Sequence, residues 1–217
     1  VRWAVDGGLV PAGEFIGVAE QTGQIRYLGQ QVLETLAGEA DDLLAILPDG
    51  ARVSVNLSVA ELEESRNVDI LHRTVLPVLG DHLIAEVTES ALLEEGSAAF
   101  AAIEGLVRAG AGLAMDDFGT GYANLSALYG MSPTVIKADQ SLLENAVSGD
   151  RRHSALLQAV VALSQAVGSV ALAEGVSDAS RLERVRSFGF DLAQGFHLAR
   201  PMALGELADF VGSTRDD

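Results

Sequence analysis

Leu113-Ala114-Met115-Asp116-Asp117-Phe118-Gly119-Thr120-Gly121 is the stretch that most clearly indicates how this chain folds. Three apolar residues lead directly into two adjacent carboxylates, and two closely spaced glycines follow. A short apolar run of this kind is typical of a buried strand. The glycines permit tight backbone turns beside a ligand. The stretch therefore predicts a buried strand that ends in acidic residues at a loop.

The same pattern recurs along the chain from about residue 52. Segments with helical spacing separate the runs; Phe100, Ile103 and Leu106 share one helix face, and Gly110 then supplies a left-handed stop. This alternation predicts a parallel sheet, either doubly wound or closed into a barrel. Six strand–helix units are two short of a closed eight-stranded barrel. The other five apolar runs are Val53-Ser54-Val55, Leu83 to Val87, Thr134-Val135-Ile136, Ser169 to Ala173 and Phe190 to Ala193.

Length and composition exclude several classes of function. The 217 residues fit one domain, and 48% are hydrophobic. A net charge of −17 disfavours binding to a nucleic acid duplex. The absence of cysteine excludes disulfides, thiolate zinc sites and cysteine nucleophiles. We expect a cytoplasmic domain without direct membrane insertion, and, because residue 1 is Val, a piece of a longer protein.

Polar residues end every predicted strand. In parallel α/β folds these ends meet at one edge of the sheet, where active sites form. For any single position, a loop residue or a helix N-cap is the commoner explanation, but six strands ending this way point to a site. Clustered carboxylates imply bound cations, and oxygen ligands suit magnesium, manganese or calcium. The residues are Asn56, Glu86 with Glu89, Asp116 with Asp117, Lys137 with Asp139, Glu174, and Gln194.

Lys137 is the only lysine in the chain, while thirteen arginines supply the remaining positive side chains. A genome rich in G and C favours arginine in general. The exception at position 137 indicates a site where a compact ammonium fits and a wide guanidinium does not. The four histidines show no metal-ligand spacing and receive no role.

Taken together, the motifs resemble the EAL domain of cyclic di-GMP phosphodiesterases. The likeness runs from residue 1 to about residue 211, and residues 212–217 form a polar tail. Arg2-Trp3 and the stretch from Leu9 to Ile16 match an early helical region of that family. The motifs, which occur in the family's order, are Ser54-Val55-Asn56-Leu57-Ser58, Glu86-Val87-Thr88-Glu89, Asp116 to Tyr122, Lys137-Ala138-Asp139, Ala173-Glu174-Gly175-Val176 and Gln194-Gly195.

The resemblance implies an α/β fold, a TIM-like (β/α)8 barrel with one antiparallel strand. The antiparallel first strand and most of the second would lie before Val1, and the glutamate of the family's name would stand three residues before it. Departures within the chain are Ala138, Gln140, where a basic residue is common, and Leu198, where an aromatic is usual.

The resemblance also implies the roles of the site residues. Two divalent cations, Mg²⁺ or Mn²⁺, would be held by Asn56, Glu86, Asp116, Asp117 and Glu174. Lys137, Glu174, Glu86 and Asp116 would act in catalysis, with Lys137 orienting the attacking water. Arg2, Asp117, Gln194 and Asp139 would support substrate binding. Glu89 would anchor the loop from Asp116 to Tyr122, which in this family links metal binding to dimerisation.

The implied reaction is hydrolysis of cyclic di-GMP to the linear dinucleotide pGpG. The expected partners are cyclic di-GMP, a second copy of the chain that binds through the segment after Asp117, and sensor or GGDEF domains in the parent protein. Two alternatives stay open. One is a catalytically inactive EAL-type receptor that binds cyclic di-GMP and signals through a protein partner. The other is an enolase-like or aldolase-like metal enzyme built on the same barrel.

Overall fold

The fold is built on one parallel sheet, seen in a computed structural model that describes residues 2–6, 8–88, 91, 96–119 and 130–214. Within these residues six strands pair side by side in chain order, and every pairing is parallel. All six predicted strands are confirmed, and with them the predicted α/β fold of the barrel type. The strands are β3 (Val53–Asn56), β4 (Leu83–Thr88), β5 (Gly112–Phe118), β6 (Val135–Ala138), β7 (Val170–Ala173) and β8 (Leu192–Ala193).

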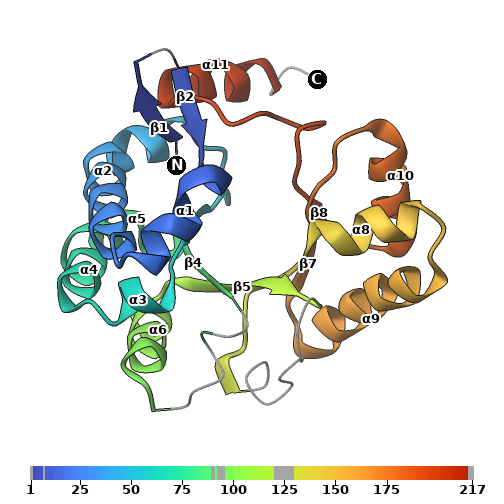
Figure 1. Ribbon diagram of the computed structural model, residues 1–217, viewed down its shortest axis with the longest axis horizontal. Coiled ribbons are helices and arrows are strands. Elements are labelled where there is room, and N and C mark those ends of the chain that lie inside the picture. The colour runs from blue at the N-terminus through green and yellow to red at the C-terminus, as the bar shows by residue number, and fades with distance from the viewer. Residues whose placement is uncertain (1, 7, 89–90, 92–95, 120–129, 215–217) are drawn as a thin grey trace.

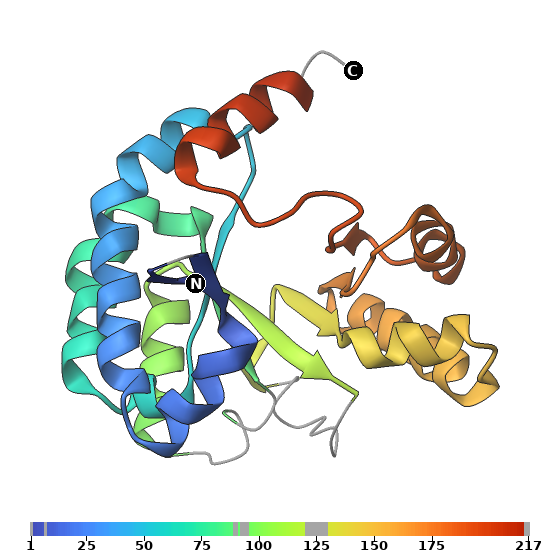
Figure 2. The ribbon, with the colours of Figure 1, turned by 45° about the horizontal axis from the view of Figure 1, so that its top comes forward.

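Helices cover the outer face of this curved sheet in two groups (Figure 1). One group lies beside β3 to β5 and the other beside β6 to β8, while α11 (Leu204–Thr214) returns to pack against α2 (Ile25–Ile46). No helix in the described ranges is both long and apolar enough for a membrane crossing. The first group further contains α3 (Val59–Leu62), α4 (Ser65–Ile70), a π-helical turn (Leu71–Val75), α5 (Leu76–Leu79), a 3₁₀ turn (Gly80–His82) and α6 (Ala98–Arg108). Helix α1 (Ala12–Gln21) lies instead at the open side of the sheet, where it contacts α2 (Figure 2). The second group contains α8 (Gln140–Val147), α9 (Arg151–Val167) and α10 (Ala179–Phe188).

Local sequence signals set the ends of these helices. The Ser97 hydroxyl accepts a hydrogen bond from the backbone N–H of Phe100 at 3.1 Å and so caps the start of α6. Gly110, with φ of +107°, follows the end of the same helix, which confirms the predicted left-handed stop. Between these ends Ile103 and Leu106 are fully buried against the sheet.

The two faces of the sheet carry different kinds of residue. Because side chains alternate along a strand, every second residue faces the helices and joins the main hydrophobic core. The residues between them face the inside of the curve, where a second, smaller apolar cluster forms. This inner cluster consists of Ile84, Ala114 and Val135, with Val170 and Leu172 packed against them.

The N-terminal segment corrects one prediction. Arg2 to Val5 and Gly8 to Pro11 are not helical; they form an antiparallel hairpin, β1 (Arg2–Val5) and β2 (Gly8–Pro11), that pairs with no strand of the main sheet among the described residues. The remainder of the predicted helical region is confirmed, since α1 begins at Ala12. Figure 2 shows the hairpin beside the start of α1, at the open side of the sheet.

Gly195 should be essential for the packing of the last strand. A Cβ at this position would lie 2.2 Å from the carbonyl oxygen and 2.4 Å from the backbone nitrogen of Val176. We expect Gly195→Ala to lower the free energy of unfolding by about 2 kcal/mol, because backbone atoms must move. Gly38→Ala, in the exposed middle of α2 with no atom within 4 Å, should raise it by about 0.5–1 kcal/mol. Urea unfolding of both variants checks this, and an equal effect of the two substitutions would contradict it.

Candidate functional site

The charged residues of the site stand directly above the inner apolar cluster. Glu86 follows Ile84 by two residues, and Asp116 follows Ala114 by two, so each carboxylate shares a strand face with an apolar member of the cluster. Lys137 stands in the same relation to Val135, and Glu174 to Leu172. Because all these strands are parallel, the four side chains meet at the carboxyl edge of the sheet.

A single buried ammonium lies at the centre of three carboxylates. The Nζ atom of Lys137 lies 2.9 Å from Oδ1 of Asp116 and 2.6 Å from Oε1 of Glu174, and it forms a short contact with Oε1 of Glu86. The side chains of Lys137 and Glu86 are only 4% and 6% exposed, so the pair is shielded from water. Sequence alone placed these four residues at one edge; the structure brings them into direct contact.

A β-bulge explains how two consecutive aspartates reach the site. Met115 pairs with Ile136 and Phe118 pairs with Ala138, so Asp116 and Asp117 together face the single residue Lys137. Asp117 adopts a left-handed backbone with φ of +54°, a conformation that aspartate tolerates better than most residues. In a regular strand one of the two carboxylates would turn to the helix side.

Burial shifts the pKa values of the cluster. Burial raises the pKa of Glu86 and of Glu174, and the hydrogen bonds from Lys137 oppose this rise without cancelling it. Burial also raises the pKa of Asp117, with further contributions from the charges of Asp116 and Asp139. For Lys137, burial acts to lower the pKa, but hydrogen bonds to Glu174 and Glu86 outweigh it and raise the pKa above its ordinary value. The ammonium therefore stays charged, and the carboxyls of Glu86, Asp117 and Glu174 hold protons more readily than free ones.

The cluster has the donor set of a divalent cation site. Ligand oxygens of Glu86, Asp116 and Glu174 lie within 4.8 Å of one another. Oδ1 of Asp116 is buried and receives no hydrogen bond, although the Lys137 ammonium lies beside it. A carboxylate oxygen that is ion-paired but accepts no hydrogen bond has lone pairs available for a cation. Carboxylate oxygens suit Mg²⁺ or Mn²⁺, so the residues present fit such an ion.

Asn56 approaches the cluster from the neighbouring strand. It is exposed at the end of β3 and stands opposite Glu86 in the strand pairing. Asn56 and Glu86 line one cavity of about 430 Å³ between the sheet and helices α1 and α2. The predicted metal ligand therefore has space beside it for an ion or a ligand.

A second cavity of about 360 Å³ opens on the other side of the cluster. Glu174 and Gln194 both line it, and Gln194 is exposed there. The predicted substrate-binding residue Asp139 acts as the N-cap of α8, where its Oδ1 accepts a hydrogen bond from the backbone N–H of Ser141 at 2.9 Å. Gln140, one of the departures from the EAL pattern, also lines this cavity.

Arg181 of this second cavity was not singled out by its sequence context. Its Nη1 donates to the carbonyl oxygen of Gly175 at 3.1 Å, and its guanidinium pairs with Asp178 at 3.4 Å and Glu144 at 3.6 Å. These contacts tie α10 to the backbone directly after Glu174. Nothing in the local sequence marks this arginine, because two of its partners, the main-chain carbonyl of Gly175 and the carboxylate of Glu144, come from other segments.

Three predictions fall outside the described part of the structure. Glu89, the expected loop anchor, lies outside the described residues, as do Thr120 to Tyr122 of the loop that it would hold. The expected dimer segment after Asp117 is described only to Gly119. Arg2 lies in β1, opposite Pro11, but its side chain is not among those described.

Comparisons with known proteins show which family the chain resembles. The EAL domain family model matches residues 1–201. The bifunctional diguanylate cyclase/cyclic di-GMP phosphodiesterase MucR of Pseudomonas aeruginosa is 33% identical over 206 residues, which cover 92% of this chain and 29% of MucR. The cyclic di-GMP phosphodiesterase NbdA of the same species is 30% identical over 220 residues, which cover 100% of this chain and 28% of NbdA.

A solved structure extends the likeness to three dimensions. The PaMucR phosphodiesterase in complex with c-di-GMP superposes with a TM-score of 0.86 at 32% identity, covering 95% of this chain and 84% of that one. The chain thus spans less than a third of the length of these two curated relatives but most of the solved domain.

Removing the central ammonium should destabilise the fold in a pH-dependent way. Lys137→Met leaves three buried carboxylates without a counter-charge, so we expect a loss of about 3 kcal/mol in the free energy of unfolding at pH 8. The loss should be smaller at pH 5, because the carboxyls of Glu86 and Glu174, whose pKa values are already raised, take up protons more readily there. Urea unfolding at the two pH values measures both losses, and equal losses would contradict the arrangement.

Divalent cations should stabilise the chain more strongly at pH 8 than at pH 5. The pKa values of Glu86 and Glu174 are raised above 4.5 in the fold, so their contribution to stability is present below pH 4.5 and is lost as the pH rises through the folded values. A metal binds deprotonated carboxylates and offsets this loss. The rise in Tm on adding Mn²⁺, with excess chelator as the control, measures the effect. A rise that does not depend on pH would count against a carboxylate site.

Proposed function

The chain belongs to the EAL domain family, and on that basis we propose that it hydrolyses cyclic di-GMP to the linear dinucleotide pGpG in a reaction that depends on divalent metal. One observation carries the proposal: the Lys137 ammonium and the carboxylates of Glu86, Asp116 and Glu174 meet at the carboxyl edge of the sheet. The relatives MucR and NbdA carry names of cyclic di-GMP phosphodiesterases, and a related domain was solved with c-di-GMP.

The proposed ligand assignment follows the positions of the oxygen donors. Asn56, Glu86 and Asp116 hold one cation, and Asp116, Asp117 and Glu174 hold a second. The bulge that sets Asp116 and Asp117 together opposite Lys137, and the position of Asp116 between Glu86 and Glu174, support a bridging role for Asp116. When bound, the cations supply Lewis acidity at the phosphodiester and neutralise its charge.

Lys137 acts in this proposal as a hydrogen-bond donor rather than as a base. Its raised pKa keeps the amine protonated at neutral pH, so it has no lone pair with which to accept a proton. Held by Glu86 and Glu174, the ammonium points into the cluster, where it orients the attacking water and compensates negative charge. Arg2, Gln194, Asp139 and Asp117 support the bound nucleotide.

The wider assignments rest on the same family membership. We propose that residues 1–211 form the phosphodiesterase unit and that residues 212–217 are a polar tail. We also propose that the protein acts as a homodimer through the segment after Asp117. We further propose that sensor or GGDEF domains accompany it in the parent protein, because the relative MucR is named as a bifunctional diguanylate cyclase/cyclic di-GMP phosphodiesterase. The following experiment also distinguishes the proposed phosphodiesterase from a catalytically inactive receptor that binds cyclic di-GMP.

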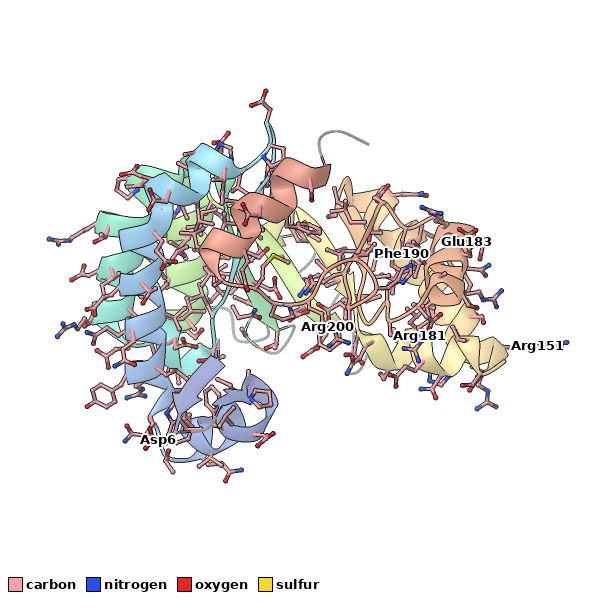
Figure 3. All side chains as sticks on the ribbon, turned by 90° about the horizontal axis from the view of Figure 1, so that it is seen from above. Asp6, Arg151, Arg181, Glu183, Phe190 and Arg200 are labelled. Carbon is pink, nitrogen blue, oxygen red and sulfur yellow. The ribbon has the colours of Figure 1, made fainter. Side chains whose placement is uncertain are left out.

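Asp116→Asn and Glu86→Gln should each lower kcat for cyclic di-GMP at least a hundredfold. Each change removes a charged oxygen donor while keeping the size of the side chain. The assay is the chromatographic formation of pGpG by the full-length protein with Mg²⁺, and excess chelator should stop the wild-type reaction. Glu183→Gln is the matched control, because Glu183 is an exposed carboxylate on α10 that pairs with Arg186 and lies at the outer side of the molecule (Figure 3).

The control should hydrolyse cyclic di-GMP at the wild-type rate. Turnover of either site variant at that rate would remove the assignment of these residues as ligands. Tight binding of cyclic di-GMP by the wild type without any turnover would instead identify the receptor.

A further inference from the structure

Glu61 is a buried carboxylate that the proposed reaction does not use. It is only 7% exposed, and it stands at the third position of the short helix α3. Its Oε2 accepts hydrogen bonds from the backbone N–H of Ser58, at 2.8 Å, and from the Ser58 hydroxyl. The Ser58 hydroxyl in turn accepts from the backbone N–H of Glu61 at 3.3 Å. The two residues form a reciprocal capping box.

Helix α2 fixes the position of this carboxylate. A Cβ on Gly29 would lie 2.0 Å from Oε1 of Glu61 and 2.7 Å from its Cδ. The carboxylate therefore lies flat against the α2 backbone in space that only glycine leaves open. One oxygen of Glu61 contacts α2, and the other holds Ser58.

Ser58 belongs to the segment that carries Asn56. Asn56 stands opposite Glu86 in the strand pairing, and the next residue, Leu57, donates its backbone N–H to the carbonyl oxygen of Glu86 at 2.9 Å. The segment from Asn56 to Ser58 is thus fixed on one side by β4 and on the other by Glu61. Asn56, Glu86 and Glu61 all line the same 430 Å³ cavity.

We propose that Glu61 is a positioning residue that holds Asn56 in place as a metal ligand by fixing Ser58 against α2. Asn56 is exposed and ends its strand, so its own side chain is not held by packing. A ligand on a loose strand end loses affinity because binding must first order it. Glu61 restricts the motion of Asn56 by binding Ser58, two residues further along the chain, and does not itself contact the metal. The inference rests on the proposed metal site but not on turnover.

The test compares Mn²⁺ binding by three variants of the full-length protein. Glu61→Ala removes the acceptor for both Ser58 donors and should weaken Mn²⁺ binding at least tenfold, the range found when groups that orient metal ligands are lost. Glu61→Gln keeps an oxygen acceptor for the Ser58 N–H. Because burial already raises the pKa of Glu61 and so favours its uncharged form, this variant should bind Mn²⁺ nearly as the wild type does. Ser58→Ala removes the hydroxyl donor but keeps the backbone N–H donor to Glu61, so its Mn²⁺ affinity should fall between those of the two Glu61 variants.

Ser97→Ala is the matched control for a purely structural effect. It removes a serine N-cap of the same kind from α6, where no site residue is attached. We expect a fall in Tm similar to that of Glu61→Ala but unchanged Mn²⁺ affinity. Isothermal titration with Mn²⁺ and thermal unfolding give the two readouts independently of any hydrolysis.

Each outcome separates the two proposals. Wild-type affinity in Glu61→Ala, or an equal loss of affinity in Ser97→Ala, overturns the role of Glu61 and leaves the proposed function standing. A wild type that binds no Mn²⁺ overturns both. If Glu61→Ala does not fold, an unchanged affinity in Ser58→Ala overturns the inference, and an intermediate affinity supports it.

Discussion

Electrostatic neutralisation of one buried cluster is the constraint on which the site depends. Glu86, Asp116 and Glu174 lie too close together, and too far from water, to carry their charges unaided. Among the residues that the structure describes, Lys137 is the only positive side chain in contact with all three, and its pKa is raised because Glu174 and Glu86 accept hydrogen bonds from it. A guanidinium would have to place five N–H donors in this space, whereas an ammonium needs to place only three. This explains why the one lysine of an arginine-rich chain stands at position 137.

The sheet meets this constraint through two regular features and one irregular one. Alternation along the strands puts an apolar residue two positions before each charged one, so the inner apolar cluster lies directly beneath the charged residues. Parallel pairing brings the strand ends to a single edge. The bulge at Asp117 then breaks the alternation at the one point where two consecutive carboxylates are needed. Its left-handed backbone is a local strain of the kind that occurs at functional sites.

Sequence reasoning recovered the parts of the fold that depend on local pattern. All six strands, the Gly110 helix stop and the grouping of Glu86, Asp116, Lys137 and Glu174 follow from apolar runs and their polar ends. The family resemblance predicts helix where the hairpin β1–β2 forms, although Asp6-Gly7 between two short apolar stretches is a recognised hairpin signal. The bulge, the contact of Arg181 with a carbonyl and the contact of Glu61 with Gly29 could not be predicted, because each depends on tertiary packing between segments whose sequences carry no sign of it.

Formal charge also bears on the order in which the proposed site is assembled. Glu86, Asp116 and Glu174 contact one ammonium, and the charges of Lys137 and Asp139 both act on Asp117, so these five carboxylates and the ammonium together carry four negative charges when all five are ionised. A dianionic nucleotide meets repulsion from such a set, and the net charge of −17 adds to it. Two divalent cations carry four positive charges and so match the set. On the proposed function, metal must therefore bind before or together with the nucleotide. Glu61, which is proposed to hold the metal ligand Asn56 in place, would then affect substrate affinity only through the metal.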